Sequence, residues 1–418
     1  PLYIDKNFLG QHLDFRFRVD RILTRQSLDT IVRDPVSGQL MPVPTGDPKG
    51  IQDGGGFRSE GSDATVALSK PLWSLASKWG ASSSFTYNNA ISRSYFRTGI
   101  RSYDDPDTPM VDGLPREYRI KTWSAAASAT RQWGDDYKHQ VNVGYNVSSL
   151  HPSLLPNFPM DPMLRMDFAD DVLPREEVIS NPFVEYSLFL AKYKTVRNID
   201  TYELAEDIRL GPNVTVGLAQ SIKLLGATNN FTRPSLSLGW TFPWGDDGFI
   251  RPSAGGQFRY QPSAPGSHET IDNTATGQIR ASTPTINIFR IIGQVHFETR
   301  WHDTQNSYYT LGSESGLRGY GIGQMIGDRR LVGQLEVRGT PYPLWVLRVG
   351  GVLFYDGGGA ANSFGQMTFL QDVGFGLRAL VPQSSRELFR FDLSFPLVNA
   401  DDVSAGHPRF TAGFDSYF

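Results

Sequence analysis

The last quarter of the chain alternates apolar and polar residues through evenly spaced segments. One clear segment spans residues 388 to 397, where the apolar Phe389, Phe391, Leu393, Phe395 and Leu397 oppose the polar Arg390, Asp392 and Ser394. Successive side chains of a β-strand point to opposite faces, so a period of two predicts strands. The same pattern occupies residues 329 to 340, 346 to 357 and 371 to 381, and a fifth segment reaches the last residue.

Earlier predicted strands come in pairs with two kinds of connection. A first strand is predicted at residues 11 to 24, and the next pairs are 62 to 71 with 80 to 92 and 116 to 131 with 137 to 149. Links within a pair are short, whereas the links at 93 to 115 and 150 to 179 are long and rich in Asp and Pro. Alternating short turns and long loops are typical of a bacterial outer-membrane barrel.

The number of predicted strands depends on one region of the chain. The middle adds seven segments, at residues 180 to 196, 198 to 210, 213 to 224, 232 to 242, 249 to 261, 269 to 281 and 286 to 301. The sum is odd, while a single-chain bacterial barrel with both ends on the periplasmic side needs an even number. We place the overcount between residues 180 and 210. The predicted fold is therefore an all-β, membrane-spanning antiparallel barrel of sixteen strands that occupies residues 1 to 418 as one domain.

Composition helps to distinguish a barrel from a soluble β-sandwich, whose strands also alternate apolar and polar residues. The apolar face is dense in Phe, Tyr and Leu, the polar face carries both signs of charge, and 418 residues are too many for one sandwich. The net charge of -3 provides no basic field for nucleic acid. The chain contains no run of about 18 apolar residues, so the sequence predicts no transmembrane helix. The chain begins at Pro1 without Met or signal peptide, so we expect a mature or trimmed chain.

A motif in a glycine-rich connection precedes the five final segments. The motif is Leu317-Arg318-Gly319-Tyr320, and we predict that residues 302 to 328 form a plug loop. Together with the segments downstream, it resembles the outer-membrane assembly and secretion superfamily that includes BamA, TamA, the two-partner secretion transporters and the bacterial surface antigens. The matching segments are 335 to 338, 351 to 358, 374 to 378, 391 to 397 and the terminal Phe418.

The resemblance implies a position for the motif. In the family, the sixth extracellular loop folds into the lumen and docks its Arg-Gly-Tyr/Phe tip on the inner wall. Carried across, Arg318 would pair with Asp356, Gly319 would permit a tight turn, and Tyr320 would pack near Gly374 and Gly376. The predicted wall residues around the motif are Asp356, Phe354, Glu336, Gly374, Gly376 and Asp392.

The resemblance also implies a lateral seam between the first and last strands. The seam would join residues 11 to 24 with 409 to 418, and Gly413 would weaken pairing there. The residues predicted to form it are Leu13, Phe15, Phe17, Gly413, Phe414 and Phe418.

The predicted function is assembly, insertion or translocation of proteins in the outer membrane of a Gram-negative bacterium. The alternatives are a secretion pore for one dedicated partner protein and a passive porin-like channel. Expected partners are outer-membrane lipid and lipopolysaccharide, unfolded outer-membrane or secreted clients, and a periplasmic POTRA module or accessory lipoproteins. No POTRA domain is predicted within this chain, and no nucleic acid is expected.

An enzyme is the third class that we considered. The seven histidines show no Ser-His-Asp order, and His296 shares a parity face with Gln294 and Glu298, as a member of a lumen network would. The chain lacks cysteine, and its Asp pairs, such as Asp135-Asp136, are typical of solvated turns. We therefore predict no catalytic residues, no metal and no cofactor.

Overall fold

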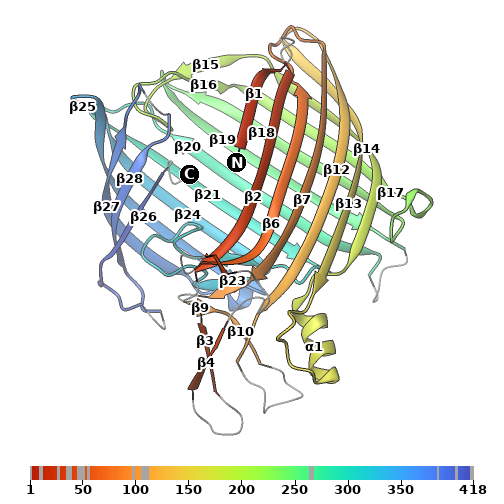
Figure 1. Ribbon diagram of the computed structural model, residues 1–418. Coiled ribbons are helices and arrows are strands. Elements are labelled where there is room, and N and C mark those ends of the chain that lie inside the picture. The colour runs from red at the N-terminus through yellow and green to blue at the C-terminus, as the bar shows by residue number, and fades with distance from the viewer. Residues whose placement is uncertain are drawn as a thin grey trace.

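The computed structural model describes residues 2–8, 13–25, 29–33, 40–44, 52–53, 57–96, 99–104, 113–262, 268–383, 386–400 and 403–414. One large antiparallel sheet of nineteen strands dominates the fold (Figure 1). The α-helix α1 (Pro162–Val172) lies outside this sheet. Within the described ranges, no helix is both long and apolar enough to cross a membrane. The predicted all-β antiparallel fold is confirmed.

The sheet is a meander in which each strand pairs with the next along the chain. Its seventeen main strands are β1 (Leu2–Phe8), β2 (Leu13–Arg25), β6 (Phe57–Lys70), β7 (Trp79–Arg93), β12 (Glu117–Trp133), β13 (Tyr137–Ser153), β14 (Glu177–Leu190), β17 (Gly211–Ser221), β18 (Phe231–Trp244), β19 (Gly248–Tyr260), β20 (Thr270–Ser282), β21 (Phe289–Trp301), β24 (Arg329–Gly339), β26 (Leu347–Ala361), β27 (Leu370–Leu380), β28 (Phe389–Pro396) and β29 (Arg409–Phe414). The other two of the nineteen, β5 (Gln52–Asp53) and β25 (Tyr342–Leu344), are short additions. The sheet curls into a barrel-shaped wall (Figure 1).

Among the described residues, five small hairpins and two short 3₁₀ helices lie outside the large sheet. They are β3 (Asp29–Arg33) with β4 (Leu40–Pro44), β8 (Tyr95–Phe96) with β9 (Gly99–Ile100), β10 (Ser102–Tyr103) with β11 (Leu114–Pro115), β15 (Tyr193–Val196) with β16 (Glu206–Arg209), β22 (Tyr309–Leu311) with β23 (Met325–Gly327), and the 3₁₀ helices η1 (Lys223–Leu225) and η2 (Phe364–Gln366).

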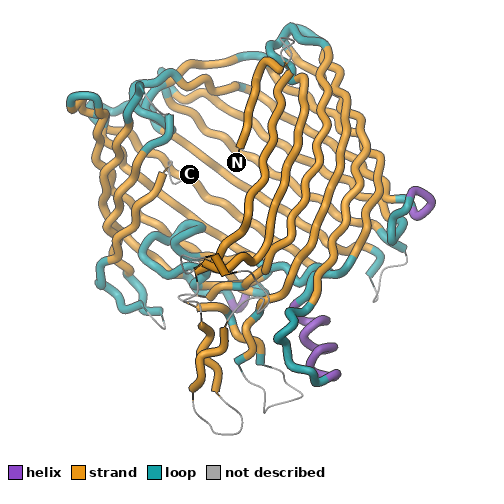
Figure 2. The backbone as a smooth tube through the Cα atoms, viewed as in Figure 1, coloured by secondary structure: helices purple, strands orange, loops and turns teal. Residues whose placement is uncertain are grey.

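The connections divide between two rims of the wall (Figure 2). The rim called here the loop rim carries α1, β3, β4 and the connection at 302 to 328, at the bottom of Figure 1. The opposite rim, the turn rim, carries β25 and the hairpin of β15 and β16. Most connections at the turn rim are short, such as residues 134 to 136 and 245 to 247. The predicted separation of long loops from short turns is therefore present, with the residue 191 to 210 connection as the main departure.

The structure confirms that the segment count was one strand too high between residues 180 and 210. The chain leaves the sheet after Leu190 and re-enters it at Gly211, so residues 198 to 210 contribute no strand to the wall. Asn198 and Glu203 have positive φ angles of 62° and 61°. The Glu206 carboxylate accepts the backbone N–H groups of Ile199, Asp200 and Thr201. These turns interrupt an extended chain, which is why the alternating pattern failed here.

Removing that segment leaves sixteen main strands from β2 to β29. The structure adds β1, which the sequence did not predict. It pairs with β2 so that Leu2 is opposite Arg18 and Phe8 is opposite Leu13. Five main strands follow the 302 to 328 connection, in the places that the alternation predicted.

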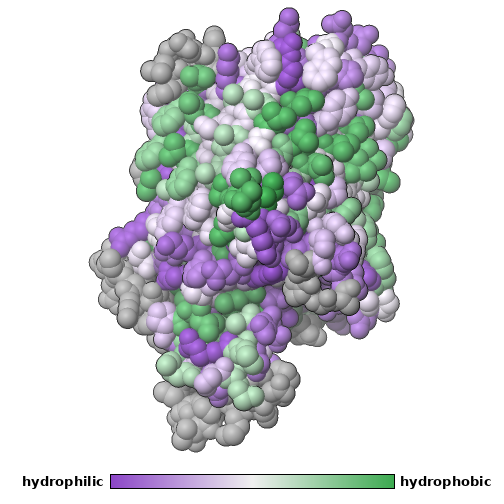
Figure 3. Space-filling view, turned by 90° about the vertical axis from the view of Figure 1, so that its right-hand side faces the viewer, coloured by the Kyte–Doolittle hydropathy of each residue, from purple (hydrophilic) through white to green (hydrophobic). Residues whose placement is uncertain are grey.

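The wall has an apolar outer face and a polar inner face. In the last strands, Leu353, Phe375 and Leu377 are 61%, 52% and 54% exposed, whereas Asp356 and Asp372 are fully buried. Hydrophobic residues gather over the upper and middle wall in Figure 3, above a hydrophilic belt. In a soluble sandwich the apolar residues are buried and the ionisable residues are exposed. Here the arrangement is reversed, as expected for a wall whose outer face contacts lipid.

Candidate functional site

The predicted motif lies in the connection between β21 and β24, in a tightly turned tip. The N–H of Leu317 donates to the carbonyl of Gly312 at 2.9 Å, and the N–H of Tyr320 donates to that of Leu317 at 3.1 Å. Gly316 has a φ of 134°, and a Cβ there would lie 2.5 Å from Val332 Cγ1. Leu317, Arg318 and Tyr320 are all fully buried. The loop tip is therefore packed against the wall rather than solvated.

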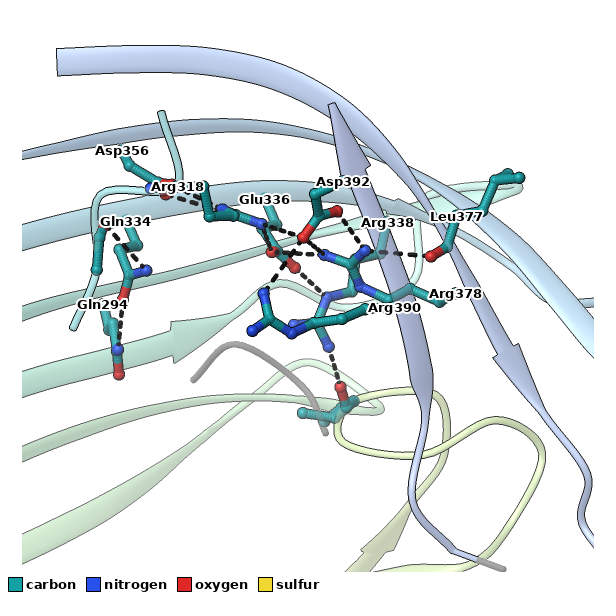
Figure 4. A network of polar contacts seen from close by, with 12 residues as sticks. Gln294, Arg318, Gln334, Glu336, Arg338, Asp356, Leu377, Arg378, Arg390 and Asp392 are labelled. Atoms are coloured by element: carbon teal, nitrogen blue, oxygen red, sulfur yellow. Dashed lines mark hydrogen bonds and ion pairs between the residues drawn. The ribbon is translucent and has the colours of Figure 1, made fainter. Parts of the chain in front are cut away.

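Arg318 is held by two carboxylates from neighbouring wall strands (Figure 4). Its Nε and Nη2 donate to the two oxygens of Asp356 at 2.7 and 2.8 Å, and its Nη1 donates to Glu336 Oε1 at 2.6 Å. The guanidinium carbon lies 3.6 Å from the centre of the Phe354 ring. A planar fork can satisfy both acids and stack on a ring at once, which the single ammonium of Lys cannot do.

The clamp around Arg318 belongs to a larger buried network (Figure 4). Glu336 Oε2 accepts from Arg338 Nε at 2.6 Å, and Glu336 Oε1 lies 3.3 Å from Arg378 Nη2. Asp392 pairs with Arg378 and lies 3.6 Å from Arg318. These side chains are nearly or fully buried. Buried charges are stable only when each one keeps its partners, so the network makes the position of the loop specific.

Gly319 is required by close packing rather than by backbone torsion. A Cβ at this position would lie 2.7 Å from Asp372 Cβ, and no positive φ is present. The expected tight turn is present, because the N–H of Tyr320 bonds to the carbonyl of Leu317 across Arg318 and Gly319, but its backbone does not require glycine. The missing side chain instead allows the loop tip to approach β27. The positive φ occurs three residues earlier, at Gly316.

Tyr320 lies closer to the loop rim than we predicted. Its hydroxyl is within hydrogen-bond distance of the carbonyls of Gln371 and Val398, at 2.8 and 3.0 Å. Burial raises the pKa of this phenol, which keeps it a neutral donor. It packs in an apolar cluster rather than beside Gly374 and Gly376. The cluster comprises Leu311, Leu317, Tyr320, Val332, Ala360, Leu370 and Val403.

Gly374 and Gly376 make room for side chains other than Tyr320. A Cβ at Gly374 would lie 2.9 Å from Phe354 Cε1, so this glycine makes room for the ring under Arg318. At Gly376 an added Cβ would collide with a carboxylate oxygen of Asp392. Both glycines therefore support the clamp indirectly, by admitting Phe354 and Asp392.

A second segment packs against the inner wall from the turn rim, and the sequence reasoning missed it. Residues 191 to 210 contain Val196, Ile199 and Tyr202, which are 3%, 1% and 1% exposed. Burial raises the pKa of Tyr202 to about 12. A Cβ at Gly350 would lie 2.8 Å from Tyr202 Cζ. The Asn and Asp residues at 198 and 200 were the available signal for turns, but alternation alone favoured a strand.

Polar contacts connect the two inserted segments. Arg338 donates from Nη1 to the carbonyl of Ile199 and from Nε to Glu336, which also accepts from Arg318. Arg348 pairs with Glu203 nearby. A continuous chain of side chains thus runs from the motif to the turn-rim segment.

The predicted seam needs a correction. Leu13 to Arg18 of β2 pair with β1 and not with the described residues 409 to 414, because the chain before β2 folds back along it and takes its backbone hydrogen bonds. In the described residues no pairing joins β29 to β1 or to β2. The labelled strands β1 and β28 lie on either side of this opening in Figure 1.

The predicted seam residues are separated. Phe15 and Phe17 are on β2, one strand in from the edge, and Leu13 is opposite Phe8. Phe414 is 61% exposed on β29 and packs against Phe389, with ring centres 4.6 Å apart. Gly413 is opposite Arg390, whose guanidinium occupies the space that a side chain would fill. Phe418 lies outside the described residues.

Comparison with known proteins finds similarity only among solved structures. No protein-family model and no curated protein sequence matches the chain. CdiB from Escherichia coli is similar with a TM-score of 0.47 and 12% identity, over 99% of this chain and 58% of that one. BamA from Haemophilus ducreyi lacking POTRA domains 1-3 is similar with a TM-score of 0.46 and 10% identity, over 99% and 66%. The FrpB iron transporter from Neisseria meningitidis is similar with a TM-score of 0.44 and 10% identity, over 95% and 59%. The chain therefore spans less than two thirds of the length of each of these three chains.

Proposed function

We propose that this chain is a Gram-negative outer-membrane barrel that inserts or translocates client proteins. The observation that carries the proposal is the edge of β29 that faces β1, which pairs with no strand among the described residues, in a wall whose loop 302 to 328 is held by the buried Arg318 clamp. A free strand edge offers backbone N–H and C=O groups that an incoming strand can pair with. The clamp would hold the wall beside this edge rigid while the edge accepts a client.

The outer face supports a place in the membrane. Leu353, Phe375 and Leu377 present a hydrocarbon surface that would be costly in water and favourable in lipid. The expected partners are therefore outer-membrane lipid and lipopolysaccharide, together with unfolded clients. A POTRA module or an accessory lipoprotein is proposed as the source of those clients.

A disulfide across the opening tests the proposal. The chain has no cysteine, so one introduced in β1, at Tyr3 or Ile4, and one in β29, at Thr411 or Ala412, would be the only thiols. Oxidised and reduced forms are compared in liposomes for insertion of an unfolded barrel client. We expect insertion to stop in the oxidised form and to return on reduction. The matched control is Phe391→Cys with Ala412→Cys, which are already opposite each other on β28 and β29.

The same experiment separates the alternatives. Full insertion with the β1–β29 bridge closed would contradict the lateral mechanism. A secreted partner that crosses equally well with the bridge open and closed would instead favour a pore through the lumen. For a passive channel, conductance would be large and unaffected by deletion of residues 302 to 328. The segments packed on the inner wall favour the first mechanism over an open channel.

A further inference from the structure

A small pocket lined by both polar and apolar groups lies on the inner face of the wall near the turn rim. It has a volume of about 280 Å³. The β17, β18 and β19 strands form its floor. In β18, Leu238 and Trp240 are 42% and 46% exposed on the outer face, so the alternate positions face inward. The inward polar residues that line the pocket are Asn213, Ser237, Thr241, Ser253, Arg209 and Arg251.

A glycine leaves the centre of this floor open. Gly239 is opposite Asn213 on one neighbouring strand and opposite Ser253 on the other. A Cβ at Gly239 would have no neighbour closer than 3.8 Å. The hollow is therefore not filled by surrounding side chains, and its walls supply an amide and hydroxyl groups.

The pocket carries an excess of positive charge. Arg209 lies 4.4 Å from the centre of the Phe189 ring, and Arg251 Nε donates to Thr241 Oγ1 at 3.0 Å. In the described part of the chain, neither guanidinium is within 4.0 Å of a carboxylate. Arg280 and Arg209 both repel Arg251, and the Asp200 carboxylate that attracts it is paired with Arg280. No carboxylate is among the residues that line the pocket, so the charges of Arg209 and Arg251 are not balanced within it.

We propose that this pocket binds an oxyanion of the phosphate type. Guanidinium groups donate paired N–H bonds that match the oxygens of phosphate, and desolvated rings behind them hold the donors in place. Hydroxyl and amide groups on the floor can donate to the remaining oxygens. An anion here would relieve the repulsion between the arginines. The proposal concerns a site separate from the Arg318 clamp and does not depend on the proposed function.

Titration with inorganic phosphate tests the site. The purified full chain, folded in detergent, is titrated by calorimetry at constant ionic strength with chloride as the balancing anion. We expect one phosphate per chain, and binding about tenfold weaker or more in Arg209→Gln or Arg251→Gln, because each loses a charge-assisted hydrogen bond. Arg300→Gln removes an inner-face charge elsewhere, beside Tyr309, and should bind phosphate normally.

A second variant tests the shape of the pocket without changing its charge. Gly239→Val retains both arginines, and its Cβ would have no neighbour closer than 3.8 Å, so its methyl groups should fill the hollow and abolish phosphate binding while the barrel still folds. Titration with glycerol 3-phosphate shows whether the pocket binds free phosphate alone or also the phosphate of a larger ester. Binding as tight as that of inorganic phosphate indicates that the pocket admits a phosphomonoester. Absence of phosphate binding by the unaltered chain would overturn the proposal. So would equal weakening in Arg300→Gln, or unchanged binding in Arg209→Gln and Arg251→Gln.

Discussion

Arg318 and Asp356, 38 positions apart in the chain, are joined by two hydrogen bonds of 2.7 and 2.8 Å between fully buried side chains. The sequence predicted this pair through the family resemblance. The structure shows that Glu336, one of the predicted wall residues, lies 2.6 Å from the same guanidinium, so that one cation is shared by two acids. This changes what substitutions should do.

Arg318→Lys should release the loop. A lysine cannot contact Asp356 and Glu336 together, and a buried acid without its partner costs about 3–5 kcal/mol. We expect a lower melting temperature and protease cleavage within residues 302 to 328, measured on the detergent-folded chain. A charge swap of Arg318→Asp with Asp356→Arg should fail to rescue, because the new Asp would lie beside Glu336. Rescue by the swap would mean that Glu336 takes no part in the clamp.

Gly350→Ala should displace the turn-rim segment. The new methyl would collide with the Tyr202 ring, because its carbon would lie 2.8 Å from Tyr202 Cζ. We expect faster proteolysis between residues 197 and 206. Gly351→Ala is the matched control, since its Cβ would have nothing within 4 Å. Similar proteolysis of the two variants would show that Tyr202 is not held by this contact.

Gly374→Ala should disturb Arg318 without touching it. The added methyl would meet both the Phe354 ring that packs under the guanidinium and the backbone carbonyl oxygen of Leu393 on β28, so the ring and the adjacent strand would have to move. Overpacking of this kind typically costs about 1–3 kcal/mol. The measurement is the free energy of unfolding in urea. Gly277→Ala, where an added Cβ meets nothing within 4 Å, provides the comparison and should be nearly neutral.

The turn between β18 and β19 should make stability depend on pH. Partial burial opposes ionisation of Asp247, but hydrogen bonds from Thr285 and the charge of Arg290 outweigh it and lower the pKa of this carboxyl. A carboxyl whose pKa is lowered by folding stabilises the protein above its ordinary range, and this stability is lost as the pH falls through the folded value. In Asp247→Asn, the free energy of unfolding should fall less steeply as the pH is lowered through the folded-state pKa of Asp247. The exposed neighbour Asp246→Asn should leave the profile unchanged.

Local pattern was enough to predict most of the wall. The alternation around Phe375, Leu377 and Arg378 identified both the strand and its two faces, because side-chain direction in an extended chain depends only on position parity. The same reasoning failed at residues 198 to 210, where Glu206 binds three backbone N–H groups of a turn. The alternation also did not predict β1, because the position of β1 depends on the edge of β2 being free to pair with it.

The sequence by itself determined the all-β fold, the inner and outer faces of the wall and the residue at the tip of the loop. Only the tertiary structure decided that Glu336 joins Asp356 around Arg318, that Gly374 makes room for Phe354, and that Arg338 reaches the carbonyl of Ile199. The physical reason is register. Parity is set within a few residues, whereas the choice of which side chains meet across strands is set by pairing between distant segments.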